Sequence, residues 1–416
     1  MTLVSKKNEF SKLSIELTSS LDKSEKKQHG IFFTPPKTIS NNLDIISPYL
    51  SGVEEVLEPS CGSCEFITEL KRRYNNMRIT GIEYNKTIFE RIQELEGKLD
   101  GVKLLHADFI SHTFDKKYDL IIGNPPYSVM KKKDVSSSYY DYFEGRPNIF
   151  ILFIVKALGL LNDDGILSFV LPKSFLNCLY YDKTRKFINE NFKILNIVNC
   201  HDQYIETQQE TVLLVVQKSK ENSCNKNYLL LKEQYTIFSN INDVKTLNCL
   251  YDNSTTLNNL GFSVSVGTVV WNQSKDILTT DSSKTLLIYN SDIKDGKVVV
   301  KSYTNEDKKN YINKKGITEP QLVINRGHGV GNYTFNYCIV NENENESREF
   351  LVENHLIVVK PMIEFTREEL IHKYKKIVKS FEDNRTKKFI NLYFGNNAIN
   401  TVELCNLLPI YTDLYQ

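Results

Sequence analysis

The chain lacks a surplus of charge of either sign, because 52 Lys and Arg residues are balanced by 51 Asp and Glu residues. No global field therefore attracts nucleic acid, and any basic surface must be local. Long hydrophobic runs are also lacking: the longest, residues 149–161, is interrupted by Lys156 and is too short to span a bilayer. The eight cysteines follow no disulfide pattern, and no secretory signal precedes the charged amino terminus. These absences predict a soluble protein of the cytoplasm (bacterial, or of a host cell if viral) with no membrane partner.

The length of 416 residues suggests two or three domains with ample core. Composition changes at residues 28–30, where a Lys- and Ser-rich stretch ends, and again past Lys218, where Asn and Ser become frequent. We therefore predict an amino-terminal extension over residues 1–28, a first domain over residues 29–220 and a second over residues 225–416. In the second domain, β-like runs are predicted at residues 262–270, 286–289, 297–302 and 321–325. A capping box at residues 366–369 predicts a helix to about residue 381.

Residues 118–127 have the pattern of a buried strand that ends abruptly in a rigid loop. Leu120 to Ile122 is an apolar run typical of a parallel sheet. Gly123, Asn124 and two prolines then end the strand, because proline cannot continue a β-ladder. The loop is thus predicted at the carboxyl end of a strand, where open α/β sheets bind their ligands.

The loop Asn124-Pro125-Pro126-Tyr127, called the NPPY motif below, presents an amide oxygen, backbone carbonyls and an aromatic ring. These groups suit methylation of an amine conjugated to a flat ring, which is a poor nucleophile because its lone pair is delocalised. The Asn124 side-chain oxygen and the Pro125 carbonyl would accept both amine hydrogens and localise that lone pair. Tyr127 would stack on the ring, an interaction worth roughly 1–3 kcal/mol per base. For an isolated motif, a plain strand-ending turn is the alternative.

Three further strand ends precede the NPPY motif. Residues 53–66 predict a strand, a tight loop and a helix start, and Gly62 lets the backbone approach a ligand closely. The next strand ends in Glu83 about 20 residues later, a spacing that suits a carboxylate accepting both hydroxyls of a ribose. The third ends in Asp108-Phe109, an acid and an aromatic that would hold and stack a purine. The alternative for Glu83 is a surface acid.

The order and spacing of these four strand ends resemble the class I S-adenosylmethionine-dependent methyltransferases. Within that class, residues 28–218 resemble the gamma-type DNA amino-methyltransferases that modify adenine, because the cofactor loop precedes the NPPY motif and a long carboxyl-terminal region follows. The resemblance implies an α/β fold with a Rossmann-like, mostly parallel seven-stranded sheet and helices on both faces. It also implies a carboxyl-terminal mixed α+β target-recognition domain and S-adenosylmethionine as cofactor.

Carried over by position, the resemblance implies two sets of site residues. The catalytic set is the NPPY motif, Asn124, Pro125, Pro126 and Tyr127. The cofactor-binding set is Thr34 (in the segment that closes over the methionine part of the cofactor), Glu58, Pro59, Ser60, Cys61, Gly62, Glu83, Tyr84, Asp108, Phe109, Asn124 and Phe153. One departure is clear, since Cys64 stands where the cofactor loop usually has its second glycine.

Cys61 and Cys64 form an isolated Cys-x-x-Cys. A zinc site needs two more ligands at matching spacing, and none lies nearby in the sequence. A redox pair is the remaining chemical alternative. We therefore predict no metal.

Basic, aromatic and amide side chains in loops are the candidates for DNA contact. Lysines beside the NPPY motif suit phosphates, amides suit adenine edges and arginine is the commonest reader of guanine. In the family, an aromatic near position 204 contacts the flipped base from its other side. The candidates are Tyr127, Lys131, Lys132, Lys133, Tyr204, Trp271, Asn272, Gln273, Arg326 and His328. For the loop residues, a solvated loop, a turn or packing is the alternative.

These observations predict a site-specific DNA methyltransferase that modifies the N6 amine of a flipped-out adenine, as part of a restriction-modification system. Double-stranded DNA is the expected partner, a cognate restriction endonuclease would be a separate chain, and the protein is expected to be a monomer. The same motif also occurs in enzymes that methylate an RNA adenine or a protein glutamine. A third alternative is an inactive DNA-recognition protein, which would carry a damaged motif, whereas this motif is intact.

Overall fold

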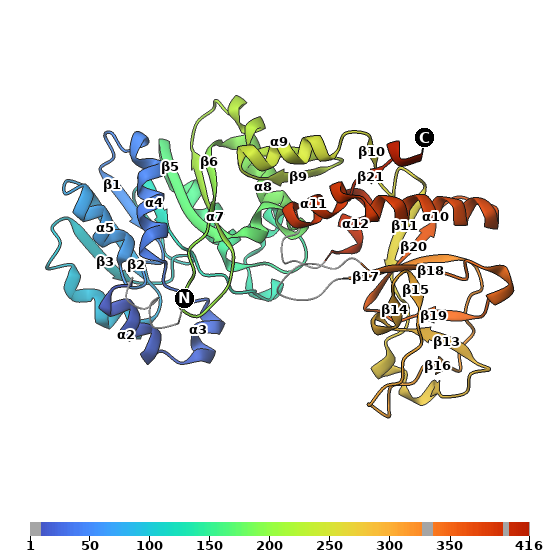
Figure 1. The fold of residues 1–416 in the computed structure, drawn as a ribbon. Coiled ribbons are helices and arrows are strands. Elements are labelled where there is room, and N and C mark those ends of the chain that lie inside the picture. Colours follow the sequence, from blue (N-terminus) through green and yellow to red (C-terminus); the bar gives the residue numbers. More distant parts are fainter. Residues whose placement is uncertain (1–9, 327–335, 394–398, 416) are drawn as a thin grey trace. The chain divides into compact units, whose positions relative to one another are not determined.

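The computed structural model describes residues 10–326, 336–393 and 399–415 (Figure 1). The chain divides into two compact units, Met1–Val244 and Lys245–Gln416. Helix α9, Ile241–Leu250, spans the division. Within the described residues, no helix has both the length and the apolar character needed to cross a membrane.

The first unit is built on a seven-stranded sheet with the strand order β3-β2-β1-β4-β5-β7-β6. All neighbours pair in parallel except β7, which is antiparallel to both β5 and β6. The predicted fold class is therefore confirmed. The strands are β1 Glu55–Glu58, β2 Arg78–Glu83, β3 Val102–His106, β4 Tyr118–Gly123, β5 Leu161–Pro172, β6 Lys193–Cys200 and β7 Thr211–Gln217.

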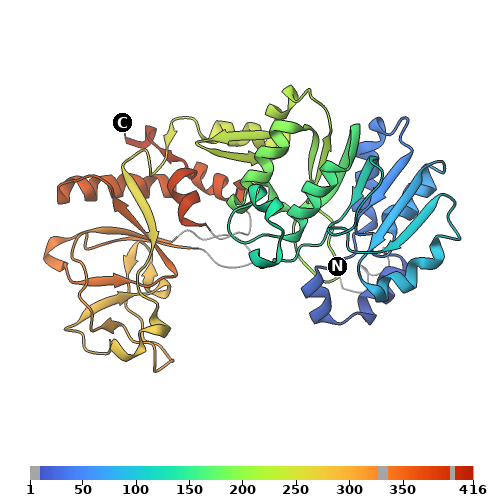
Figure 2. The ribbon, with the colours of Figure 1, turned by 180° about the vertical axis from the view of Figure 1, so that it is seen from behind.

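Helices cover both faces of this sheet, as Figures 1 and 2 show from opposite sides. One apolar layer joins the sheet to α4, α5 and α6, and the other joins it to α7 and α8. Adjacent strand residues serve opposite layers: Leu120 faces the first and Ile121 the second, as the alternation of side chains along a strand requires. The helices are α4 Pro36–Ile46, α5 Glu65–Arg73, α6 Lys86–Ile92, α7 Ile149–Gly159 and α8 Asp182–Asn191.

The amino-terminal segment is part of the first unit rather than an appendage. It forms α2, Lys12–Ser20, and α3, Lys23–His29. From α2, the Ser14 hydroxyl donates to Ser63 Oγ at 2.8 Å, in the loop between β1 and α5. From α3, the buried Lys26 ammonium lies 2.8 Å from the Glu206 carboxylate. Residues 10–29 therefore pack directly against the parts of the sheet that carry the predicted site.

The first unit also extends beyond the predicted boundary at residues 220–225. A hairpin of β8, Leu229–Lys232, and β9, Tyr235–Phe238, packs on α8. Asp182 of α8 accepts the Thr236 backbone N–H at 2.7 Å. The shift to Asn- and Ser-rich composition near residue 218 thus precedes the structural division by about 25 residues, because the hairpin buries its apolar face on the first unit.

The second unit is a mixed α+β assembly. Its larger sheets have the orders β11-β20-β17-β18 and β12-β16-β13-β19. The elements are β10 Ser254–Thr255, β11 Phe262–Val266, β12 Leu278–Thr279, β13 Thr285–Ile288, β14 Ile293–Lys294, β15 Lys297–Val298, β16 Tyr311–Ile312, β17 Gln321–Asn325, β18 Tyr337–Val340, β19 Phe350–Val352, β20 Leu356–Pro361, β21 Ile410–Tyr411, α10 Arg367–Glu382, α11 Asn384–Tyr393 and α12 Thr401–Asn406.

The local predictions in this unit met different outcomes. The strand predicted at residues 321–325 is confirmed, whereas those predicted at residues 262–270 and 297–302 are shorter than expected. The capping box is confirmed: Thr366 Oγ1 accepts the Glu369 N–H at 3.2 Å, and the Glu369 carboxylate accepts the Thr366 N–H at 2.9 Å. Capping depends on residues three apart, so it is readable from sequence, whereas strand length depends on partners distant in the chain.

Candidate functional site

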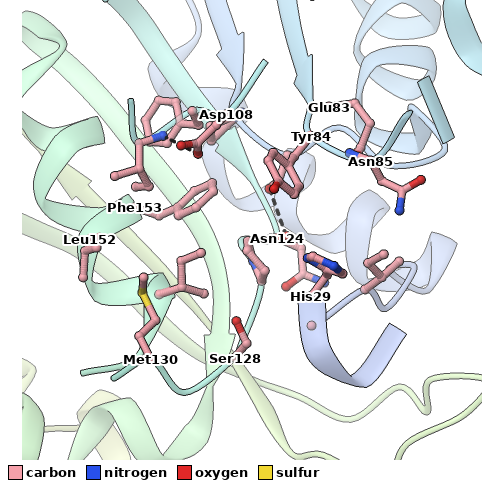
Figure 3. Close-up of a pocket in the computed structure, with 18 of the residues that line it drawn as sticks. His29, Glu83, Tyr84, Asn85, Asp108, Asn124, Ser128, Met130, Leu152 and Phe153 are labelled. Atoms are coloured by element: carbon pink, nitrogen blue, oxygen red, sulfur yellow. Dashed lines mark hydrogen bonds between the residues drawn. The ribbon is translucent and has the colours of Figure 1, made fainter. Parts of the chain in front are cut away.

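A cavity of about 370 Å³ lies in the first unit at the carboxyl ends of the central strands (Figure 3). Because β3, β2, β1 and β4 are neighbours in that order, the loops that follow them meet at one edge of the sheet. The segment after α3 and the first turns of α7 complete the wall. Ten predicted site residues line it: Pro59, Ser60, Gly62, Glu83, Tyr84, Asp108, Phe109, Asn124, Pro126 and Phe153.

Five other predicted residues lie behind this wall and do not line the cavity: Thr34, Glu58, Cys61, Pro125 and Tyr127. Four of them are buried, and Tyr127 is half-buried. Glu58 is 2% exposed, and burial raises the pKa of its carboxyl well above the usual value. In this conformation, a ligand in the cavity would contact them only after a local movement.

The loop between β1 and α5 has a tight backbone. Cys64 adopts the left-handed conformation, with φ 61°, directly before α5. Glycine is usual at this position, and the left-handed conformation costs a residue with a side chain roughly 1–2 kcal/mol. Gly62 is also left-handed, and a Cβ there would lie 3.5 Å from the Phe33 ring. The absence of a side chain at Gly62 leaves the cavity open beside Phe33.

Glu83 ends β2 with its carboxylate held in place by backbone donors. The Gly62 N–H donates to Oε2 at 2.9 Å and the Asn85 N–H donates to Oε1 at 2.7 Å. Burial raises the pKa of the Glu83 carboxyl, and these hydrogen bonds oppose the rise. Each oxygen accepts one of these bonds and has a further lone pair, so the carboxylate can also accept hydroxyl donors from a ligand.

Asp108 and Phe109 follow β3 and form the opposite end of the cavity. Asp108 Oδ1 accepts the Ile110 N–H at 3.0 Å. The Phe109 and Phe153 rings lie 4.8 Å apart at 39° and provide an apolar surface. The Lys156 ammonium donates to the Ile110 carbonyl at 2.7 Å. The loop after β3 is therefore fixed from α7.

The Asn124 side chain is bonded at both ends. Its Nδ2 donates to Thr34 Oγ1 at 2.9 Å and to the Phe32 carbonyl at 3.4 Å. Its Oδ1 accepts the Tyr127 hydroxyl at 2.5 Å. The Ser60 hydroxyl donates to the Asn124 carbonyl at 3.1 Å and so connects the NPPY motif to the cofactor loop.

Tyr127 lies outside the cavity in this conformation. Its hydroxyl also reaches the Val170 carbonyl at 2.9 Å, and its ring is edge-on to Phe150, with centroids 6.1 Å apart. Tyr204 is 4% exposed and its hydroxyl lies among those of Thr211 and Tyr127. Burial raises the pKa of both tyrosines. Stacking of Tyr127 on a base requires the ring to leave this contact.

The remaining DNA candidates that the structure describes are not among the residues that line the cavity. The side chains of Lys131, Lys132 and Lys133 are exposed beside it, and the Lys132 ammonium lies 4.7 Å from the Tyr140 ring centroid. In the second unit, Trp271 packs against the small apolar cluster around Leu287, while Asn272 and Gln273 are exposed. Arg326 is half-buried. His328 lies outside the described residues.

Sequence reasoning missed several lining residues before α4 and after the NPPY motif. They are His29, Gly30, Ile31, Phe32, Ser128, Met130, Asp134, Val135, Ser136 and Leu152. Gly30 could have been recognised as a helix end, since glycine after a basic turn is a typical C-cap. A Cβ at Gly30 would lie 2.7 Å from the Tyr127 backbone N, so this glycine permits the segment to touch the NPPY motif.

The charged lining is mostly acidic. Of the described residues around the cavity, Glu83, Asp108 and Asp134 are carboxylic acids, and His29 is the one basic side chain. Three carboxylates around an apolar floor favour a ligand that carries positive charge and hydroxyl or amine donors. In the described part of the chain, no group of three or more His, Cys, Asp or Glu side chains is placed to hold a metal ion.

Residues 6–205 match the model of the Eco57I restriction-modification methylase family. This part of the chain is therefore similar to the Eco57I-family methylases. The chain as a whole is 29% identical over 400 residues to Type II methyltransferase M.CvrRI of Paramecium bursaria Chlorella virus XZ-6E, a match covering 94% of this chain and 96% of the relative. It is 28% identical over 215 residues to modification methylase CviBIII of Paramecium bursaria Chlorella virus NC1A, covering 51% of this chain and 55% of the relative.

The fold of the chain is similar to that in the cryo-electron microscopy structure of a DrdV–DNA complex. The TM-score is 0.56 at 12% sequence identity, and the match covers 96% of this chain and 57% of the other. The resemblance read from the sequence is confirmed, including the class I methyltransferase fold and the restriction-modification family.

The cofactor is S-adenosylmethionine, and the residues around the cavity fit it. The Glu83 carboxylate suits a ribose diol, Asp108 suits an amine donor of the purine, and the Phe109 and Phe153 rings suit its faces. The volume of about 370 Å³ is that of a small-molecule site. The acidic lining suits a cofactor that bears a sulfonium charge, and the cofactor supplies a methyl group activated by that charge.

Proposed function

We propose that this protein is a site-specific DNA methyltransferase of a restriction-modification system that modifies the N6 amine of a flipped-out adenine. The observation that carries the proposal is that Asn124 and Pro126 of the NPPY motif line the same cavity as Glu83 and Asp108. An amine acceptor and a cofactor site thus share one enclosure. The names of the relatives, which are Type II and modification methylases, support the same class.

Each part of the site has a role in this reaction. The target adenine leaves the base stack at a cost of a few kcal/mol, because its amine cannot otherwise reach the cavity. Asn124 Oδ1 and the Pro125 carbonyl accept the two amine hydrogens and localise the nitrogen lone pair. Tyr127 stacks on the base once its ring leaves Phe150. Most of the rate enhancement then comes from positioning and desolvation.

The second unit is proposed to read the DNA sequence. Its candidate contacts remain Trp271, Asn272, Gln273 and Arg326. The first three lie on one short turn, where the side-chain amides of Asn272 and Gln273 are exposed. Amides suit adenine edges and arginine suits guanine. Lys131, Lys132 and Lys133 beside the cavity are proposed to contact phosphates. A cognate endonuclease on another chain and a monomeric state remain predictions.

One experiment tests the proposed function directly. Purified protein is incubated with plasmid DNA and S-adenosylmethionine, protection is mapped with a panel of restriction enzymes, and the DNA is hydrolysed for mass spectrometry of its nucleosides. We expect N6-methyladenine at one short sequence. Methylcytosine, or methyl transfer only to RNA or to a protein glutamine, would overturn the proposal.

Asn124→Ala separates chemistry from cofactor binding in this assay. Because Asn124 contributes an acceptor for the target amine, we expect methyl transfer to fall by orders of magnitude while calorimetric affinity for S-adenosylmethionine stays near that of the wild type. Equal transfer rates for the two proteins would remove the NPPY motif from the mechanism.

A further inference from the structure

The carboxamide of Asn124 has two chemically different ends, and the proposed reaction needs only one of them. Its oxygen accepts a hydrogen from the target amine, whereas its nitrogen carries two donors and would repel that amine. Rotation by about 180° around the last side-chain bond exchanges the ends with little change of shape, because that torsion is broad and roughly two-fold. Something in the protein must therefore set which end faces the substrate.

The segment between α3 and α4 provides that discrimination. Asn124 Nδ2 lies 3.4 Å from the Phe32 carbonyl and 2.9 Å from Thr34 Oγ1. A carbonyl can only accept, so the group facing it must be the amide nitrogen rather than the oxygen. Thr34 Oγ1 is the closer of the two acceptors and therefore makes the stronger contact.

The oxygen end of the Asn124 carboxamide is also hydrogen-bonded, but it can still become available to a substrate amine. The Tyr127 hydroxyl lies 2.5 Å from Asn124 Oδ1 and 2.9 Å from the Val170 carbonyl. A hydroxyl has one hydrogen and can donate it to only one of these acceptors at a time. Oδ1 is therefore released when Tyr127 donates to Val170 instead, or when its ring leaves this contact to stack on the base, while the nitrogen end stays fixed.

Thr34 is placed for this role and not for contact with the cofactor. It is 6% exposed and does not line the cavity. The family resemblance had assigned it to the cofactor set, but in this structure its hydroxyl accepts a hydrogen bond from Asn124, which does line the cavity. Thr34 can therefore influence the reaction through the Asn124 side chain.

We propose that Thr34 is a positioning residue that, together with the Phe32 carbonyl, fixes the orientation of the Asn124 carboxamide so that its oxygen faces the target amine. This proposal rests on the proposed function. It goes beyond that function because the Phe32 carbonyl, which can only accept, selects the nitrogen end, and Thr34, about 90 positions from Asn124 in the sequence and not part of the cavity lining, supplies the shorter bond that holds that orientation.

The test compares Thr34→Val, which keeps the shape but removes the acceptor, with Thr34→Ser, which restores it. Thr38→Val is the matched control, because Thr38 is also buried and its hydroxyl donates to Asp202 at 2.8 Å rather than to the NPPY motif. For Thr34→Val we expect kcat to fall about tenfold, the effect of losing one ordinary hydrogen bond. Affinity for S-adenosylmethionine by calorimetry should change less than about twofold, Thr34→Ser should recover the rate, and Thr38→Val should retain it.

A second readout does not depend on activity. Protein labelled with ¹⁵N-asparagine shows the side-chain amide hydrogens, and the Asn124 signals are those missing from Asn124→Ala. In Thr34→Val these signals should shift, and in Thr38→Val they should not. If wild-type protein transfers no methyl group to DNA adenine, the proposed function fails while this readout still tests Thr34.

Two results would overturn the role of Thr34 in an active enzyme. The first is weakened cofactor affinity in Thr34→Val with an unchanged kcat, which would return Thr34 to the cofactor site. The second is an unchanged kcat together with unchanged Asn124 amide signals, which would show that the Phe32 carbonyl alone sets the orientation.

Discussion

A single methyl group added at Gly30 should disturb catalysis through the NPPY motif. It ends α3 in the left-handed conformation, with φ 65° and ψ 35°. A Cβ there would lie 2.7 Å from the Tyr127 backbone N and 3.2 Å from the Ser128 backbone N. These distances are well below the roughly 3.5–4.0 Å at which nonbonded heavy atoms pack best. The obstructing atoms are backbone, so they cannot rotate away.

Two effects of Gly30→Ala can be separated. The left-handed conformation costs a side chain roughly 1–2 kcal/mol, which lowers the free energy of unfolding. The collision must also move the NPPY motif or the segment after α3 by several tenths of an ångström. Because a misplacement of about 1 Å can cost roughly a hundredfold in rate, we expect kcat to fall about tenfold or more.

Gly52→Ala is the matched control. Gly52 is also left-handed, with φ 80°, but a Cβ there has no heavy atom within 4 Å. Gly52→Ala should therefore lose only the roughly 1–2 kcal/mol of the left-handed conformation in urea unfolding and keep methyl transfer to the target DNA, whereas Gly30→Ala should lose at least as much stability and also lose methyl transfer. If the two variants show the same kcat, the close approach of Gly30 to the NPPY motif has no catalytic importance and the reasoning is wrong.

Two further predictions concern stability, measured by urea unfolding without cofactor. Glu58 is buried, its Oε2 lacks a hydrogen-bond partner among the described residues, and burial raises the pKa of its carboxyl. The protonated carboxyl therefore favours the folded state. Its contribution to the free energy of unfolding is fully present below the unfolded pKa of about 4.3 and is lost as pH rises through the folded pKa. Glu58→Gln should therefore be more stable than wild type at pH 8, with the gap closing towards pH ~4, and a constant gap would contradict this. Arg185 is fully buried and donates to three backbone carbonyls beside Asp182, so Arg185→Met should cost about 3–5 kcal/mol. The exposed Arg72, changed to Met, should cost less than about 1 kcal/mol, and similar losses for the two would contradict the burial argument.

Much of the site could be predicted because its signals are local in the sequence. An apolar strand followed by Gly123 and the NPPY motif requires only neighbouring residues, and so do the strand that ends in Glu83 and the one followed by Asp108. Parallel strands bring their carboxyl ends to one edge of a sheet, so these residues had to meet once the fold class was right. The capping box at Thr366 is local in the same sense.

Tertiary structure alone decided which of these residues face the cavity and which support them from behind. Thr34 and Tyr127 carry suitable groups for a cofactor and a base, yet in the fold their hydroxyls bond to the two ends of the Asn124 carboxamide. The predicted boundary near residue 225 failed for a related reason, since the hairpin after it packs on α8. Such contacts join positions far apart in the chain, and their geometry depends on how the sheet and helices pack rather than on any local pattern. The sequence by itself therefore determined the chemistry available at the edge of the sheet, and packing determined the orientation in which that chemistry is presented.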